Sequence, residues 1–128
     1  MASTSHDLTS LVARILLSTI FILAGIEKIT GYEGSAQYME AYGLPAVLLP
    51  GAIVVELGGG LAILLGLFSR YAALVLAVFC LVTAAIFHST FTGEGSQTQI
   101  IMFMKNIAIT GGLLLLFANG PGRFALKD

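Results

Sequence analysis

Charged side chains are scarce in this sequence: 10% of its 128 residues are Asp, Glu, Lys or Arg, whereas an ordinary soluble domain carries about 25%. The net charge of -1 and the absence of Trp leave no basic, aromatic-rich surface, which excludes nucleic acid as a partner. Hydrophobic residues make up 57% of the chain. This composition is typical of a membrane protein, so we expect the lipid bilayer to be its main partner.

Cysteine and histidine are nearly absent as well. Cys80 is the single cysteine and lies in an apolar run, which excludes an intrachain disulfide and a dithiol redox pair. His6 and His88 are too far apart in sequence for a metal site of standard ligand spacing, so no metal is expected. The sequence also lacks motifs for a flavin, a haem or an iron-sulfur cluster, and no covalently bound cofactor is expected.

Four apolar segments are long enough to cross a bilayer as helices, for which about 20 residues suffice. They cover residues 8–29, 47–68, 71–88 and 98–118. Because no linker divides the chain, residues 1–128 are predicted to form a single all-α domain, a four-helix transmembrane bundle. In the first connection, residues 35–42 are expected to form a short amphipathic helix that ends at Gly43.

Glu56 is the one ionisable residue of the second segment and lies near its middle. A carboxylate at that depth costs about 2.5 to 3.5 kcal/mol on insertion scales, so it should face the protein interior and have a partner. The simplest arrangement pairs it with Lys105 of the fourth segment. Asn106, His88 and Lys28 would lie around the same outward-opening cavity and complete a ligand or proton site. Alternatively, the ion pair serves only to fix the register of the helices.

Arg14 is the sixth residue assigned to this candidate site, although it lies deeper toward the opposite side of the membrane. Its guanidinium is expected to snorkel to the headgroups or to reach a main-chain carbonyl of the second or fourth segment.

Small residues predict where the helices pack closely. Gly25 of the first segment would let another backbone approach, and Gly58, Ala62 and Gly66 form a stripe with a spacing of four in the second.

The distribution of Lys and Arg predicts the orientation. Arg70, Arg123 and Lys127 flank one side, whereas residues 30–46 and 89–99 of the opposite connections contain neither Lys nor Arg. The positive-inside rule therefore places both termini in the cytoplasm.

Four pieces of the chain together resemble the DoxX family of small four-helix bacterial inner-membrane proteins. The matching pieces are VARILLSTIFILAGIEKITGY, LPGAIVVELGGGLAILLGLFSR, TAAIFHSTF and MFMKNIAITGGLLLLFANGPGRF. The recurrent polar and small positions of that family correspond here to Arg14, Gly25, Lys28, Glu56, Gly59 and Lys105.

This resemblance implies an association with redox chemistry, because some relatives are linked to quinone-dependent sulfur oxidation or to membrane redox complexes. The chain would then be a redox accessory subunit rather than a stand-alone oxidoreductase. A quinone or a redox partner protein would carry the electrons. The family offers no established catalytic residue to transfer.

Two further functions stay open on the sequence. The chain could be a small proton-coupled transporter or exporter in which Glu56 exchanges a proton, and so short a chain would need a homodimer to enclose a pathway. It could also be a ligand-free assembly factor that binds its partner through the stripe of Gly58, Ala62 and Gly66.

Overall fold

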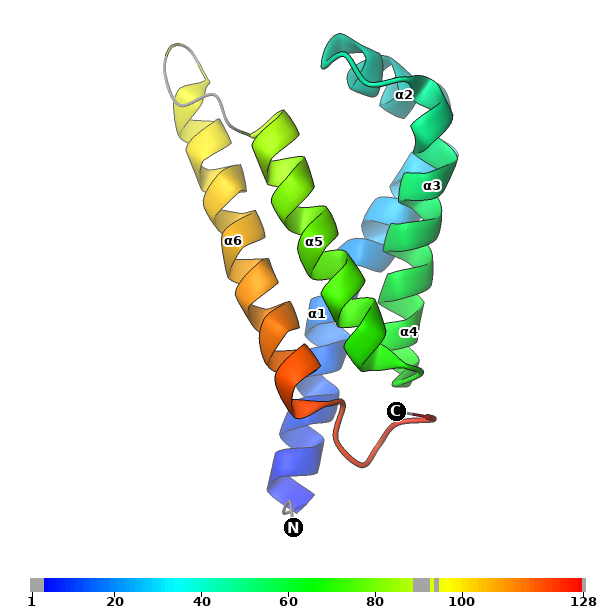
Figure 1. Cartoon of the computed structure of the whole chain (residues 1–128), viewed down its shortest axis with the longest axis vertical. Helices are drawn as coiled ribbons and strands as arrows, with labels where there is room; N and C mark the ends of the chain where they lie inside the picture. Colours follow the sequence, from blue (N-terminus) through cyan, green and yellow to red (C-terminus); the bar gives the residue numbers. More distant parts are fainter. Residues whose placement is uncertain (1–3, 89–92, 94, 128) are drawn as a thin grey trace.

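The computed structural model describes residues 4–88, 93 and 95–127, and its regular elements within these ranges are helices (Figure 1). Four helical segments are long and apolar enough to cross a membrane, which confirms the four predicted spans within a few residues at each end. A short helix fills the first connection. In chain order the elements are α1 (Thr4–Thr30), α2 (Tyr32–Ala41), η1 (Ala46–Leu48), α3 (Leu49–Ile53), η2 (Val54–Gly58), α4 (Gly59–Leu65), α5 (Ser69–Phe87) and α6 (Ser96–Asn119).

The helices pack as two pairs. The helix α5 lies along α6, while α1 lies against η2 and α4 of the second span. Figure 1 shows that the pairs converge at the end that holds both termini and separate at the opposite end, where α2 lies. We call these the terminal end and the loop end. A cluster of buried apolar side chains joins the two pairs; it contains Phe21, Ile63, Leu76, Cys80 and Leu113.

The second span is not a uniform α-helix, in contrast to the single helix of residues 47–68 that we predicted. It begins with the 3₁₀ turn η1, and its middle, η2, is a π-helical turn that contains Glu56. The span ends at Leu65 because Gly66 adopts the left-handed conformation, with φ of +70°. A π-helical turn contains more residues than an α-helical turn. Residues at a spacing of four therefore do not stay on one face of the span across η2.

The connection between α4 and α5 and the C-terminal tail lie side by side at the terminal end. The tail runs beside the connection between α4 and α5 and forms three main-chain hydrogen bonds with it. The Phe68 amide donates to the Lys127 carbonyl over 2.6 Å, and the Lys127 amide donates to the Gly66 carbonyl over 3.0 Å. The Leu126 amide donates to the Leu65 carbonyl over 3.1 Å. The tail is thus part of the folded bundle.

Close helix packing uses glycines that were only partly predicted. Gly25 does face another backbone: a Cβ there would lie 2.8 Å from the Cβ of Leu57. On the second span, Gly59 packs against Leu76 and Gly60 packs against Ile22 and Phe21 of α1. The predicted stripe is wrong as a packing groove, because Gly58 has no neighbouring atom within 4 Å of a built Cβ among the described residues. Gly66, its other end, serves the turn, and Ala62 is half-buried.

Candidate functional site

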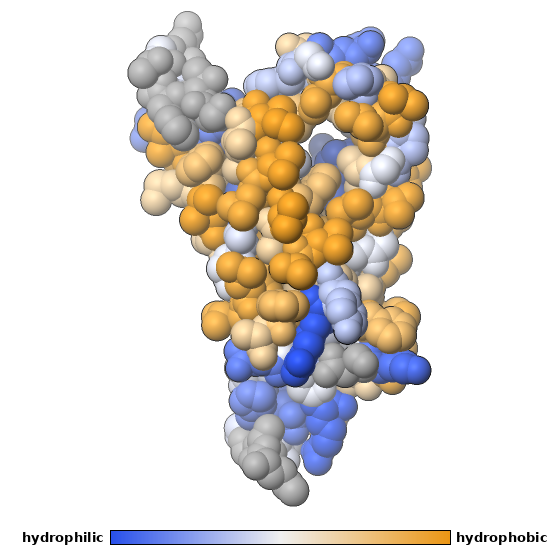
Figure 2. Space-filling model, viewed as in Figure 1, coloured by the Kyte–Doolittle hydropathy of each residue, from blue (hydrophilic) through white to orange (hydrophobic). Residues whose placement is uncertain are grey.

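A cavity of about 960 Å³ occupies the loop end, between the two helix pairs and next to α2. Its wall is mostly aliphatic and aromatic, with a few polar side chains contributed by α1, η2, α5 and α6. Figure 2 shows the surface hollowed in this region, with apolar atoms around the opening. Apolar cavities of this size with a few polar groups are typical of small-molecule sites. Five of the six predicted site residues line it, namely Lys28, Glu56, His88, Lys105 and Asn106.

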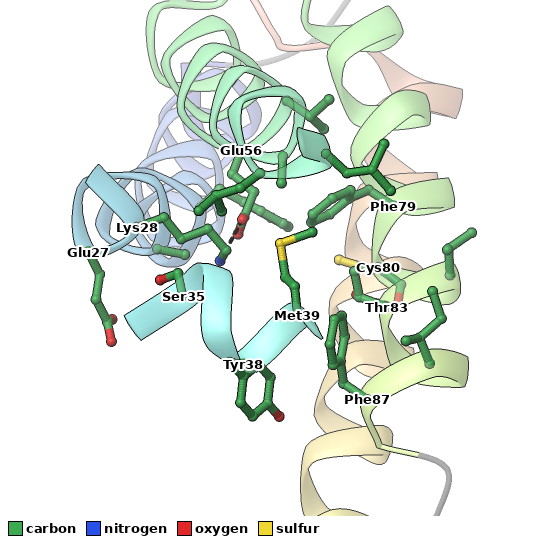
Figure 3. A pocket seen from close by; sticks show the side chains of 18 of the residues that line it. Glu27, Lys28, Ser35, Tyr38, Met39, Glu56, Phe79, Cys80, Thr83 and Phe87 are labelled. Carbon is green, nitrogen blue, oxygen red and sulfur yellow. Dashed lines mark hydrogen bonds and ion pairs between the residues drawn. The ribbon is translucent and has the colours of Figure 1, made fainter. Parts of the chain in front are cut away.

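The buried carboxylate of Glu56 forms an ion pair with Lys28 of α1. Lys28 Nζ lies 2.7 Å from Glu56 Oε1, and the two side chains are 30% and 7% exposed (Figure 3). Both residues line the cavity, so the pair forms a charged patch in an apolar wall. Glu27, the neighbour of Lys28, points away from this pair in Figure 3.

The predicted pairing of Glu56 with Lys105 is therefore wrong in its partner. The second span packs against α1 through Gly25 and Gly60, which brings Lys28 rather than α6 next to Glu56. The π-helical turn then directs the carboxylate toward α1. The ammonium lies against Oε1, a buried oxygen that has no further partner among the described residues.

Lys105 lies on the other wall of the cavity, on α6. Its ammonium contacts Met102 Sδ at 3.4 Å, and sulfur is a weak acceptor. No carboxylate lies within ion-pair distance of Lys105 in the part of the chain that the structure describes. One wall of the cavity thus has a neutralised ion pair, and the other has a cation with a weak acceptor.

Asn106 and His88 connect α5 to α6 at the edge of the cavity. The Asn106 amide nitrogen donates to the Cys80 carbonyl over 3.2 Å and to Thr83 Oγ1 over 3.3 Å. His88 caps the end of α5, and its Nδ1 lies 3.0 Å from Gln99 Oε1 of α6. The donors of Asn106 are therefore occupied by α5, so this residue positions the wall rather than offering hydrogen bonds to a ligand.

Three aromatic rings attach α2 to the end of α5 beside the cavity. Tyr38 stacks on Phe87 with centroids 5.3 Å apart, and Tyr42 meets Phe87 edge-on at 4.9 Å. Burial, together with the neighbouring Tyr42, raises the pKa of Tyr38 to about 12. No local pattern in the sequence signals the contact of these tyrosines with Phe87. In Figure 3 the buried side chain of Met39 extends from α2 toward Phe79 and Cys80.

Arg14 is not part of this cavity. It is 1% exposed and lies near the terminal end. Its guanidinium contacts main-chain carbonyls, which was one of the two predicted alternatives. Arg14 Nη1 donates to the Ile63 carbonyl over 3.3 Å and to the Leu64 carbonyl over 3.5 Å, and Nη2 donates to the Phe124 carbonyl. Its positive charge thus stabilises the C-terminus of α4 and attaches the tail to it.

Comparison with known proteins gives a consistent assignment. Residues 9–89 match the family model named DoxX. The chain is 53% identical to the Escherichia coli (strain K12) inner membrane protein YqjF, over 94% of this chain and 91% of that protein. It is 38% identical to the inner membrane protein YphA of the same strain, over 91% of this chain and 86% of that protein.

A more distant relative bears a redox name. The chain is 27% identical to a Bacillus subtilis (strain 168) protein named "Putative oxidoreductase CatD", over 87% of this chain and 85% of that protein. No solved structure matches the chain.

Proposed function

The chain belongs to the DoxX family of small inner-membrane proteins, and from this premise we propose that it is a membrane subunit that binds a quinone or a similar small amphiphile beside a redox partner. The observation that carries the proposal is the cavity of about 960 Å³, mostly apolar, with a buried ion pair on one wall and Lys105 on the other. An amphiphilic ring needs both features. The redox name of the distant Bacillus subtilis relative supports an association with redox chemistry.

The charged groups have complementary roles in this proposal. Lys105 donates a hydrogen bond to a carbonyl oxygen of the ring and stabilises negative charge that develops there on reduction. Glu56, the buried carboxylate on the cavity wall, accepts or supplies a proton. Lys28 limits the cost of the carboxylate in the apolar wall. The partner protein supplies or removes the electrons.

The orientation of the chain is part of the proposal. Both termini lie at one end, and Arg70, Arg123 and Lys127 accompany them. We place this end in the cytoplasm because positively charged residues are retained there. The cavity then lies in the half of the bilayer that faces away from the cytoplasm, where a quinone can enter laterally from the lipid.

Ligand-dependent stability of the purified protein tests this proposal. Full-length protein in detergent is titrated with a short-chain quinone while its thermal unfolding is followed, and co-extracted quinone is measured by chromatography. A ligand at 100 times its Kd adds about 2.7 kcal/mol to the stability of the folded state. We expect the wild type to be stabilised and Lys105→Met and Glu56→Gln to lose most of this effect.

Glu40→Gln is the matched control, because it removes an exposed carboxylate of α2 that does not line the cavity. It should keep the response of the wild type. Absence of co-extracted quinone, together with identical titrations for the wild type and Glu56→Gln, would reject the proposal.

The transporter alternative is less well supported. A cation exchanger needs a carboxylate that alternates between a proton and the transported cation, whereas Lys28 already lies 2.7 Å from Glu56. The assembly-factor alternative would use the exposed face at Gly58, which has no neighbour within 4 Å among the described residues. A flux assay in proteoliposomes and a pull-down in mild detergent distinguish these alternatives from quinone binding.

A further inference from the structure

The buried guanidinium of Arg14 has no opposite charge next to it. No carboxylate lies within ion-pair distance of Arg14 in the described ranges, and its Nε is buried without a hydrogen-bond partner. The carbonyls at the end of α4 supply only the partial negative charge of a helix C-terminus, about half a unit. Asp7, a buried carboxylate at this end, binds the tail, since its Oδ1 accepts from the Arg123 amide at 3.1 Å. A buried charge that is only partly compensated favours an anion nearby.

Arg14 also lines a second cavity, of about 650 Å³, between α1 and α6 at the terminal end. The groove has a polar part and an apolar part. His6, Ser10, Arg14 and Asn119 supply the polar part. Leu16, Leu17, Leu115 and Leu116 line the apolar part, which is nearer the middle of the spans.

Along the groove the polar residues come first and the apolar residues follow toward the middle of the membrane, which is the order of the headgroup and the acyl chain in a lipid. The helix α1 begins at Thr4, so Ser10 lies within its first two turns and near headgroup depth. Leu16 and Leu115 are 69% and 66% exposed, so the apolar part of the groove is open to the surrounding hydrocarbon. A free ion would match only the polar part.

We propose that this groove binds one anionic phospholipid from the leaflet at the terminal end. The phosphate lies at Ser10 and Asn119 and compensates the charge of Arg14, and one acyl chain follows Leu16 and Leu115 toward the middle of the membrane. Basic pockets between transmembrane helices recognise anionic headgroups in this way. The site is independent of the quinone cavity, because its residues lie on other parts of α1 and α6.

Binding of defined lipids to the purified full-length protein tests the proposal. Native mass spectrometry in detergent measures the binding of phosphatidylglycerol, with phosphatidylcholine and inorganic phosphate as comparisons. We expect one phosphatidylglycerol per chain, bound about tenfold more tightly than phosphatidylcholine, which corresponds to the strength of one charge-assisted contact. Arg14→Gln should abolish the preference between the two lipids.

Two glycine variants keep the test valid if Arg14→Gln does not fold. A Cβ on Gly112 would lie 3.7 Å from Leu17 Cδ1, so Gly112→Leu fills the groove without touching the guanidinium. Gly111 is exposed and has no described atom within 4 Å of a built Cβ, so Gly111→Leu is the matched control. We expect Gly112→Leu to weaken phosphatidylglycerol binding about tenfold and Gly111→Leu to leave it unchanged.

Three results would overturn the proposal. They are equal binding of the two lipids by the wild type, undiminished binding by Gly112→Leu, and binding of inorganic phosphate that is as tight as binding of phosphatidylglycerol. The last result would indicate a site for a free anion.

Discussion

The two ends of the bundle use buried charge in different ways. At the terminal end, Arg14 binds main-chain carbonyls and Asp7 binds a main-chain amide, so that a tail and a helix end are held together. At the loop end, Lys28 and Glu56 bind each other beside a large cavity. The first arrangement fixes the backbone, whereas the second keeps charges available at a surface that a ligand can reach.

This difference indicates how a short chain combines stability with a site. The helix pairs converge where polar side chains hold the backbone and separate where aromatic rings attach α2 to α5. Substitutions at the terminal end should therefore reduce the free energy of unfolding. Substitutions at the loop end should mainly alter ligand binding and the interaction between Lys28 and Glu56.

The largest effect is expected from Arg14→Met. This change leaves the carbonyls of Ile63, Leu64 and Phe124 without their side-chain donor, and the free energy of unfolding should fall by about 3 kcal/mol. Far-UV circular dichroism during SDS titration in mixed micelles measures it. Ser18→Ala is the control, since Ser18 is buried on the same helix but bonds only to Ile15 of its own turn. Equal losses in both variants would contradict the proposed role of Arg14.

Double-mutant cycles at the loop end test which lysine interacts with Glu56. Lys28→Met and Glu56→Gln should show a coupling energy of about 1 to 2 kcal/mol, because the two groups lie 2.7 Å apart. The cycle of Lys105→Met with Glu56→Gln should show less than about 0.5 kcal/mol. Unfolding midpoints of the six proteins give both values. A larger coupling for Lys105 would restore the pairing that the sequence suggested.

Gly25→Ala tests the close approach that positions the ion pair. The added methyl group would lie 2.8 Å from Leu57 Cβ and 3.1 Å from its amide nitrogen, and overpacking of this kind costs about 1 to 2 kcal/mol. Gly58→Ala meets open space and should be neutral or stabilising, since Ala is the better helix former. Thermal unfolding compares the two. If Gly58→Ala were the more damaging change, the predicted stripe would have to be reinstated as an interface.

The smallest effect concerns the titration of Tyr38. Its pKa is raised from the ordinary value of 10.0 to about 12, so its neutral form contributes stability that is complete below about pH 10 and is lost as the pH rises toward 12. Absorbance titration of tyrosinate should show one high-pKa transition that Tyr38→Phe removes. Tyr71→Phe is the control, because Tyr71 is exposed at the other end of α5. Normal titration of all four tyrosines would contradict the burial of Tyr38 next to Tyr42.

Much of the fold was predictable because lengths and apolar runs determine it. The four spans, the close approach at Gly25 and the contact of Arg14 with a carbonyl of the second span follow from local patterns. The bundle orders its helices through side-chain packing, however, and the apolar segments are too alike for the sequence to show which of them are neighbours. The choice of Lys28 over Lys105 as the partner of Glu56 depends on that neighbourhood.

Two features of the site had no local signal. No pattern in residues 54–58 predicts a π-helical turn, yet this turn sets the direction of the Glu56 carboxylate. The ring contacts join Tyr38 and Tyr42 to Phe87, which is more than 40 residues away in the chain, so only the folded arrangement brings them together. The sequence therefore identified five polar residues of the cavity wall and assigned the wrong partner to Glu56.

Because of the π-helical turn at Val54–Gly58, the direction of the Glu56 carboxylate depends on the winding of the helix as well as on side-chain chemistry. Each α-helical residue rotates the chain by about 100°, whereas a π-helical turn spreads one revolution over more residues, so winding these same five residues as α-helix would rotate one half of the span relative to the other. A segment of the same length without the π-helical turn would no longer hold its carboxylate in the present direction, toward Lys28.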